Sequence, residues 1–534
     1  MSQHKAKVSC VLIALLAVAA AWAQSPNASP KALAVSNAYL EANARALGLT
    51  NAGEELRVRG SSVDAQGNNH IRYDQFYKGV RVFEGEAVGH VTQEGAVTLT
   101  NGVRGNIDLD VNPSVARGSA LDTAARELGV HGSYDAFYGA LEILPRGSRS
   151  LADMLVWHFR IFVENDSDLT AQWDAFVDAR NGALLWYFDS LETAAKGGGS
   201  SQPATATGDT MYSGARTLSV TRSSAGVYTL QDPLRVGNQV LTMKNTTTGK
   251  TASLTSTTGV FGDFLKITSN PNTAGADAHF GMQATWDYLK NAFGRNGLDG
   301  LGKPVTLRVH YGVGYGDAFW MGGACYCATF GDGNSIGTYP IVYPGDIGHE
   351  LAHGLMQSEA NLTYTGESGG LNESNSDILG EMVRFSVYGY PIDSTDWWVF
   401  PAQNVKNYDS SGNYVPWRAW RYLDNPPLGT GAPSACWSTD TNSLEVHIAG
   451  QPNSHAFYLL AHGGTSVCNG QVVAGIGNTD AARIWYDAVT NWMTASTDYH
   501  GARTAALNAA AAKFGAGSAQ YNAVTAAYSA INVN

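Results

Sequence analysis

Two short stretches of the chain combine side chains that bind metal ions with a carboxylate that can act as a base. The first is the pentapeptide HELAH at 349–353, and the second begins at Glu373. Residues four apart on a helix share one face, so His349 and His353 can direct their imidazoles at one ion with Glu350 beside it. We therefore predict a zinc site whose ligands are these two histidines and Glu373.

The composition of this ligand set indicates a catalytic rather than a structural zinc ion. Glu373 stands 20 residues after His353, and Asp377 follows one helical turn later as an outer carboxylate. Two imidazoles and one carboxylate leave the fourth tetrahedral position to water. An ordinary amphipathic helix is the competing interpretation of residues 349–353, and the second motif argues against it.

The N-terminus and the charge balance indicate an exported protein. Residues 1–23 carry early basic side chains, then a largely apolar run, and end in Ala21-Trp22-Ala23, which is typical of a secretory signal peptide. No later segment approaches the ~20 apolar residues of a membrane span. With 34 basic and 46 acidic residues, the net charge of −12 argues against a nucleic-acid partner. We expect a secreted, extracellular protein.

A candidate domain boundary follows from composition. Residues 194–203 are small, polar and rich in turn formers, as in a flexible joint that a protease can cut. Before the joint, residues 57–99 alternate in polarity like antiparallel strands, and residues 116–128 have helical spacing. Beyond it, strand patterns dominate to about residue 270, and helical patterns follow Glu350. The sequence predicts an α+β protein with the zinc helix between two lobes.

Around these motifs the chain resembles the thermolysin family of secreted zinc endopeptidases, carried as a precursor. The likeness is loose at 207–214, firm at 277–280 and 315–320, and continues through the zinc motifs to 446–458. Residues 73–80 resemble the first prodomain of that family. The resemblance implies a signal peptide (1–23), a first and a second propeptide domain (24–110, 111–195), a β-rich catalytic lobe (196–345) and an α-helical catalytic lobe (346–534).

The resemblance also implies a role for each site residue. His349, His353 and Glu373 match the zinc ligands, and Glu350 matches the base that takes a proton from the zinc-bound water. The remaining matches are His447 and Tyr364 as donors to the developing oxyanion, Asp377 as acceptor of a ligand imidazole NH, expected to be that of His349, Arg421 as donor to a substrate carbonyl, and Ala318 and Asp317 as contacts to an extended peptide backbone.

The chain departs from the family pattern at several of these places. Asp317 stands where the family usually has asparagine, and Asn442 stands where an aspartate often supports the histidine matched by His447. Gly345 and Arg384 replace a calcium-binding aspartate and glutamate. Calcium requires several oxygen ligands and an arginine repels it. Calcium binding stays open, but we do not expect the paired calcium site.

The four cysteines outside the signal peptide are an even number, as expected of disulfides in an exported chain. Their spacing favours Cys436 with Cys468 and Cys325 with Cys327. Four cysteines nevertheless permit three pairings, so connectivity stays open at this point.

Three functions are compatible with these patterns. The first is a neutral endopeptidase made as a zymogen, whose prosegment assists folding and covers the cleft, with protein and peptide substrates. The family favours bulky apolar residues after the cut, and Asp346, near that pocket, can shift this preference. The others are a noncatalytic binding protein with a zinc-stabilised fold and, less well supported, a zinc exopeptidase. Glu350 separates the first two, because a structural zinc ion needs no base.

Overall fold

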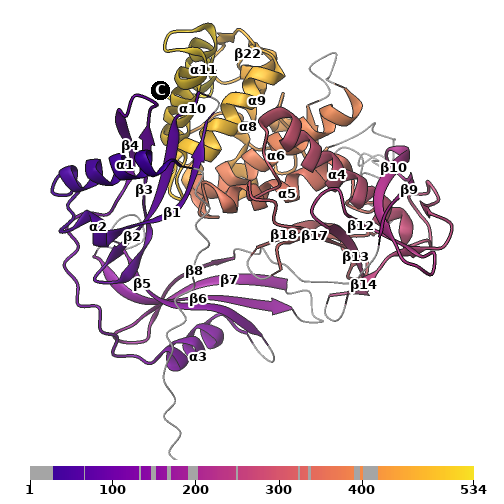
Figure 1. The fold of residues 1–534 in the computed structure, drawn as a ribbon, viewed down its shortest axis with the longest axis horizontal. Coiled ribbons are helices and arrows are strands. Elements are labelled where there is room, and N and C mark those ends of the chain that lie inside the picture. Colours follow the sequence, from indigo (N-terminus) through magenta and orange to yellow (C-terminus); the bar gives the residue numbers. More distant parts are fainter. Residues whose placement is uncertain are drawn as a thin grey trace, which may run out of the picture.

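A computed structural model describes residues 28–64, 66–130, 134–145, 152–164, 170–189, 202–247, 251–322, 325–334, 338–389, 397–400 and 419–534. The predicted signal peptide and most of the predicted joint lie outside these residues. In Figure 1 the N-terminal part, indigo to magenta, lies beside a mixed strand and helix body formed by the rest of the chain.

The N-terminal part is built on one twisted eight-stranded sheet. Its elements are α1 (Pro30–Asn43), α2 (Ala52–Glu55), β1 (Leu56–Val63), β2 (Asn69–Tyr77), β3 (Val80–Val91), β4 (Val97–Gly102), α3 (Arg117–Glu127), β5 (Asp135–Leu144), β6 (Met154–Glu164), β7 (Thr170–Asp178) and β8 (Leu184–Asp189). The strand order is β1-β2-β3-β5-β6-β7-β8, with β4 on β3. The strands that the alternating pattern predicts are therefore present.

This sheet is continuous across the boundary expected between two propeptide domains. β3 pairs with β5 in parallel, whereas the other pairings of this sheet are antiparallel. Arg81 on β3 and Glu142 on β5 form an ion pair of 3.2 Å across that junction. The Glu142 carboxylate is fully buried and needs such a partner. The two predicted propeptide domains therefore form one continuous sheet.

Two sheets form the first lobe that follows. One contains β9 (Gln202–Thr210), β10 (Gly214–Arg222), β11 (Tyr228–Thr229), β15 (Thr255–Ser256) and β16 (Val260–Gly262). The other contains β12 (Gln231–Asp232), β13 (Asn238–Thr246), β14 (Ala252–Ser253), β17 (Thr306–Tyr311), β18 (Ala318–Met321) and β19 (Cys327–Gly331), with β18 at its edge. Because β9 begins at Gln202, the predicted joint extends two residues too far.

The lobe predicted as β-rich also holds a 22-residue helix, α4 (Asn272–Phe293), which the sequence patterns did not indicate. Its buried residues lie on most of its circumference and many are small, so no polar stripe alternates with an apolar one. A Cβ on Gly281 would lie 2.8 Å from Ile347, so α4 packs closely on the next helix.

The second lobe is mostly helical. Its elements are α5 (Pro344–Ser358), α6 (Gly366–Tyr388), β20 (Trp398–Val399), β21 (Arg421–Tyr422), η2 (Pro426–Leu428), η3 (Thr441–Ser443), α7 (Val446–Ala449), α8 (Gln451–His462), β22 (Gly464–Thr465), β23 (Val472–Val473), α9 (Asn478–Asp487), the π-helical turn η4 (Ala488–Trp492), α10 (Tyr499–Phe514) and α11 (Ala519–Ala530). One apolar core runs through both lobes. The α+β expectation is confirmed, and no helix of the described chain could cross a membrane.

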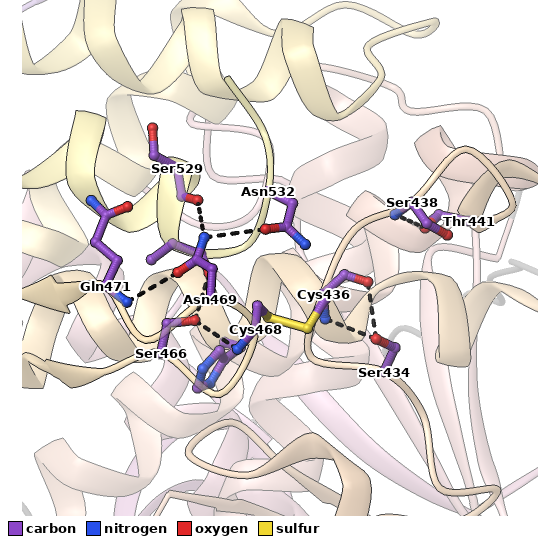
Figure 2. The surroundings of a disulfide bond; sticks show 12 residues. Ser434, Cys436, Ser438, Thr441, Ser466, Cys468, Asn469, Gln471, Ser529 and Asn532 are labelled. Carbon is purple, nitrogen blue, oxygen red and sulfur yellow. Dashed lines mark hydrogen bonds between the residues drawn. A yellow bond between two sulfur atoms is a disulfide. The ribbon is translucent and has the colours of Figure 1, made fainter.

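Both favoured disulfides form, Cys325–Cys327 and Cys436–Cys468. The second closes a segment with a sequence separation of 32 that includes α7. Figure 2 shows its surroundings, where Ser434 and Ser466 hydroxyls accept hydrogen bonds from the two cysteine backbone nitrogens at 2.9 and 3.0 Å. The disulfide therefore anchors both ends of the segment that carries His447.

The N-terminal sheet contacts the helical lobe through charged side chains of β2 and β3. Arg72 on β2 donates to the backbone oxygens of Thr490 and Met493, at 2.5 and 3.1 Å, where η4 ends. On β3, Glu86 accepts from the backbone nitrogen of Ala495 at 2.6 Å. The Arg72 hydrogen bonds satisfy carbonyl groups near the end of a helix, and the Glu86 carboxylate satisfies a backbone N–H just beyond it.

A second carboxylate of β3 reaches the loop between α5 and α6. Glu84 accepts from the Thr363 hydroxyl at 2.5 Å, and both groups are buried. A cavity of about 680 Å³ lies beside this contact, lined by Trp186 of β8 and by residues at the start of α6. The N-terminal part thus lies against the start of the helix that carries Glu373.

Candidate active site

Close packing of α5 on α6 brings the two sequence motifs together. A Cβ on Gly380 of α6 would lie 2.6 Å from the Gly345 carbonyl oxygen and 3.3 Å from the His349 backbone nitrogen. A Cβ on Gly348 of α5 would lie 3.1 Å from the Cα of Gly380. Only residues without side chains permit this approach, so the glycines set the distance between the motifs.

The three predicted ligands converge on one point. The distance between the Nε2 atoms of His349 and His353 is 3.3 Å, and each lies 3.5 Å from an oxygen of Glu373. Tetrahedral ligands about 2.0–2.1 Å from zinc stand about 3.3–3.4 Å apart, so the spacing matches a zinc ion. Within the described chain this is the one group of three or more such residues that could hold a metal.

The chemistry of the donors also fits a metal ion. Burial lowers the pKa of His353 to about 4, so its imidazole is neutral and can act as a ligand. Burial opposes ionisation of Glu373, but His447 and His353 hold its pKa below the usual range. The Oε2 atom of Glu373 is buried and accepts no hydrogen bond from the described residues. A cation at this point would satisfy it.

Each histidine is oriented through its other ring nitrogen. His349 Nδ1 lies 2.8 Å from Asp377 Oδ1, the partner expected from the sequence. His353 Nδ1 lies 2.8 Å from Asn372 Oδ1, a partner that sequence reasoning missed. The sequence signal for Asn372 was its position directly before Glu373 in the second motif. These acceptors favour the tautomer that leaves Nε2 free for a metal.

We expect Asn372→Ala to weaken zinc binding about 10- to 100-fold, because His353 Nδ1 loses its nearer acceptor and keeps only the Ser376 hydroxyl at 3.2 Å. Competition for zinc with a chelator of known affinity measures this. Asn375→Ala is the matched control, since Asn375 lies on the same helix and accepts from Trp485 at 3.0 Å instead of from a ligand. Equal zinc affinity in the two variants would exclude a role for Asn372 at the metal.

Arg421 lies behind Asp377 and is tightly paired with it. Its Nε and Nη2 atoms lie 2.7 and 2.5 Å from the two carboxylate oxygens. Burial alone would raise the pKa of Asp377, but Arg421 and His349 lower it, so the carboxylate is ionised. The predicted contact of Arg421 with a substrate carbonyl stays a prediction, and the observed contact orients a ligand histidine through Asp377.

Glu350 and Tyr364 stand beside the ligands, as the motifs suggest. Glu350 is buried, and burial, Glu373 and Asp317 raise its pKa well above the usual value. Tyr364, in the loop between α5 and α6, donates its hydroxyl hydrogen to Glu373 Oε1. Burial and Glu373 raise the pKa of Tyr364, so it keeps that hydrogen. The Glu350 carboxyl and the neutral Tyr364 hydroxyl therefore both feel the charge of the Glu373 carboxylate.

His447 approaches Glu373 from α7. Its Nε2 lies 3.3 Å from Glu373 Oε2, and its Nδ1 lies 2.7 Å from Glu445 Oε1. Burial lowers its pKa, but Glu373 and Glu445 outweigh this and raise it to about 9. Sequence reasoning sought the supporting group at Asn442 and missed Glu445, whose only signal was a carboxylate two residues before the histidine.

Two of the three residues matched to substrate binding, Asp317 and Ala318, lie where an edge strand begins. β18 pairs with β19 on one side and has no described strand on the other. Ala318 begins this strand, and the exposed Asp317 accepts a hydrogen bond from the Ala318 backbone nitrogen at 2.9 Å. Free backbone groups along such an edge can pair with an extended peptide.

At the positions matched to the calcium site, α6 carries an ion pair within the helix and α5 has a glycine. The Arg384 guanidinium pairs with Glu381 at 2.7 Å, and both side chains are buried. A Cβ on Gly345 would lie 3.6 Å from the Cβ of Arg384. A fixed positive charge therefore lies where the family pattern places calcium ligands. Asp346 is buried on the same stretch of α5.

Comparison with known proteins extends this likeness to most of the chain. The thermolysin metallopeptidase catalytic domain matches residues 205–357, and the thermolysin metallopeptidase alpha-helical domain matches residues 360–533. The fungalysin/thermolysin propeptide motif matches residues 54–102. The catalytic-domain match covers the β-rich lobe and nearly all of α5, the second match covers the rest of the helical lobe, and the propeptide match covers the strands β1–β4.

Individual relatives are similar over comparable lengths. The transglutaminase-activating metalloprotease of Streptomyces mobaraensis is 33% identical over 482 residues, covering 87% of this chain and 59% of that protein. Bacillolysin of Bacillus cereus is 30% identical, covering 83% and 79%, and thermolysin of Alicyclobacillus acidocaldarius subsp. acidocaldarius is 28% identical, covering 82% and 78%. Together with the geometry of the site, these matches show that this chain belongs to the thermolysin family of metallopeptidases and carries a propeptide.

Proposed function

We propose that the protein is a secreted, zinc-dependent neutral endopeptidase that is made as a zymogen and hydrolyses internal peptide bonds. The observation that carries the proposal is the convergence of His349, His353 and Glu373, at zinc spacing, beside Glu350 on the same helix. The signal-like residues 1–23 support export, and the family membership supports peptide hydrolysis.

The side chains of this site divide the chemistry between them. The two histidines and Glu373 would hold zinc, which when bound would act as a Lewis acid and lower the pKa of water toward ~7. Glu350 receives the proton of the attacking water and passes it to the leaving nitrogen. His447 and Tyr364 donate hydrogen bonds to the carbonyl oxygen as negative charge develops on it.

The free edge of β18 selects the shape of the substrate. An extended peptide adds to this edge through backbone hydrogen bonds, with Ala318 and Asp317 as contacts and Arg421 as donor to a substrate carbonyl. Binding along a strand extends on both sides of the scissile bond, which favours an endopeptidase over an exopeptidase. We propose a preference for bulky apolar residues after the cut, shifted by the buried carboxylate of Asp346.

The N-terminal part acts as an inhibitor and a folding aid. We propose a first propeptide domain at 24–110, a second at 111–195, and maturation near the joint at 194–203. The contacts of Arg72, Glu84 and Glu86 with the helical lobe support this role, because they engage the loop before α6 and the end of η4. They bury charged groups that would otherwise lie in water.

Cleavage-site profiling on a peptide library tests the proposal. The mature protein should cut within extended peptides, lose activity when a zinc chelator is added, and regain it when zinc is restored. Release of terminal residues alone would indicate an exopeptidase. Retention of zinc without any cleavage would support the alternative of a noncatalytic binding protein.

A further inference from the structure

Glu445 holds His447 at two points. Its Oε2 accepts a hydrogen bond from the His447 backbone nitrogen at 3.0 Å, and its Oε1 lies 2.7 Å from the His447 ring nitrogen Nδ1. Glu445 is the residue that caps the N-terminus of α7, so its backbone position is fixed relative to the histidine. A single carboxylate therefore fixes both the start of the helix and the direction of the imidazole.

The imidazole needs such a contact because little else holds it. The side chain of His447 is 47% exposed, so packing leaves its side-chain torsions free to change. Its Nε2 lies 3.3 Å from Glu373 Oε2, on the side of the metal ligands. With Nδ1 bound to Glu445, the ring plane and the direction of Nε2 are set.

The residue expected to support His447 is engaged elsewhere. Asn442 Oδ1 accepts from the Glu367 backbone nitrogen at 3.1 Å, in the first turn of α6. The same oxygen would lie 2.5 Å from a Cβ on Gly366, which has a φ of 58°. Asn442 thus caps α6, and a side chain at Gly366 would displace it.

We propose that Glu445 is a positioning residue for the reaction and orients His447 from the position two residues before it. The proposal rests on the proposed function, in which His447 donates from Nε2 to the carbonyl oxygen. Glutamate suits this place because its side chain is long enough to reach the ring while its backbone still precedes the helix. Aspartate at 445 is one methylene shorter and should support the ring less well.

A double-mutant cycle tests this role on the purified mature enzyme. Glu445→Ala should lower kcat about 10- to 100-fold and change KM by less than about threefold, because a displaced donor affects the transition state more than substrate binding. In a His447→Ala background, the same change should cost less than about twofold. Glu445→Gln keeps the length and separates loss of charge from loss of the helix cap.

Asn442→Ala is the matched control, since it removes a helix cap in the same segment without touching His447. The fold-losses in kcat from Asn442→Ala and His447→Ala should multiply in the double variant, as expected of independent changes. A loss from Glu445→Ala of the same size in both backgrounds would overturn the positioning role, as would full kcat in Glu445→Ala. Full activity of His447→Ala itself would instead refute the proposed role of His447, so the two failures are distinguishable.

Discussion

Replacing Glu350 with alanine should lower kcat/KM for an internally quenched peptide about 10³- to 10⁴-fold, the upper range for loss of a positioned acid or base. Glu350 is buried on α5 beside the ligands but is not itself one of the three converging groups. The variant should therefore still bind one zinc ion. It should also accumulate as uncut precursor if maturation is autocatalytic.

Metal content distinguishes this loss from damage to the site. Zinc measured by atomic absorption should match the unaltered protein in Glu350→Ala and in the isosteric Glu350→Gln. Glu373→Ala should lose zinc and activity together. Undiminished hydrolysis by Glu350→Ala would refute its role as base and favour a noncatalytic zinc protein.

Replacing Arg72 with alanine should weaken binding of the cleaved prosegment to the mature enzyme about 100-fold, since truncating a buried, hydrogen-bonded charge costs about 3 kcal/mol. Arg72 is 5% exposed and donates to the carbonyl oxygens of Thr490 and Met493, and truncation removes both of these hydrogen bonds. Titration of the two separated parts by calorimetry gives the dissociation constant.

Arg57→Ala is the matched control for Arg72. Arg57 lies on the neighbouring strand β1, is exposed, and stacks on Phe76 of the same sheet at 3.9 Å. Its removal should leave the dissociation constant within about twofold, as is usual for an exposed side chain away from the interface. If both variants bind equally well, the contacts of Arg72 do not hold the prosegment.

The candidate metal ligands could be predicted from sequence because most of their geometry is local. His349 and His353 share a helical face through a spacing of four, and Asp377 follows Glu373 by the same spacing. The sequence does not show how close α5 and α6 approach. That distance depends on Gly348 and Gly380 meeting across two helices.

The missed residues depend on contacts between segments or on side-chain direction. Glu445 contacts His447 while Asn442 accepts a hydrogen bond from the start of α6, and the sequence does not show which of the two side chains faces the histidine. The helix α4 was missed because burial on most sides removes amphipathic periodicity. The shared N-terminal sheet was missed because β3 pairs with β5, across the predicted domain boundary. Alternation identifies strands but not their partners.

The contacts of Arg72, Glu84 and Glu86 are noncovalent and lie far along the chain from the joint at 194–203. If maturation cuts the joint, as proposed, these contacts persist and the internal association becomes a bimolecular equilibrium that depends on concentration. Specific activity of freshly cut enzyme should then rise on dilution. A concentrated sample of cut enzyme should therefore stay inhibited by its own prosegment, and dilution should activate it.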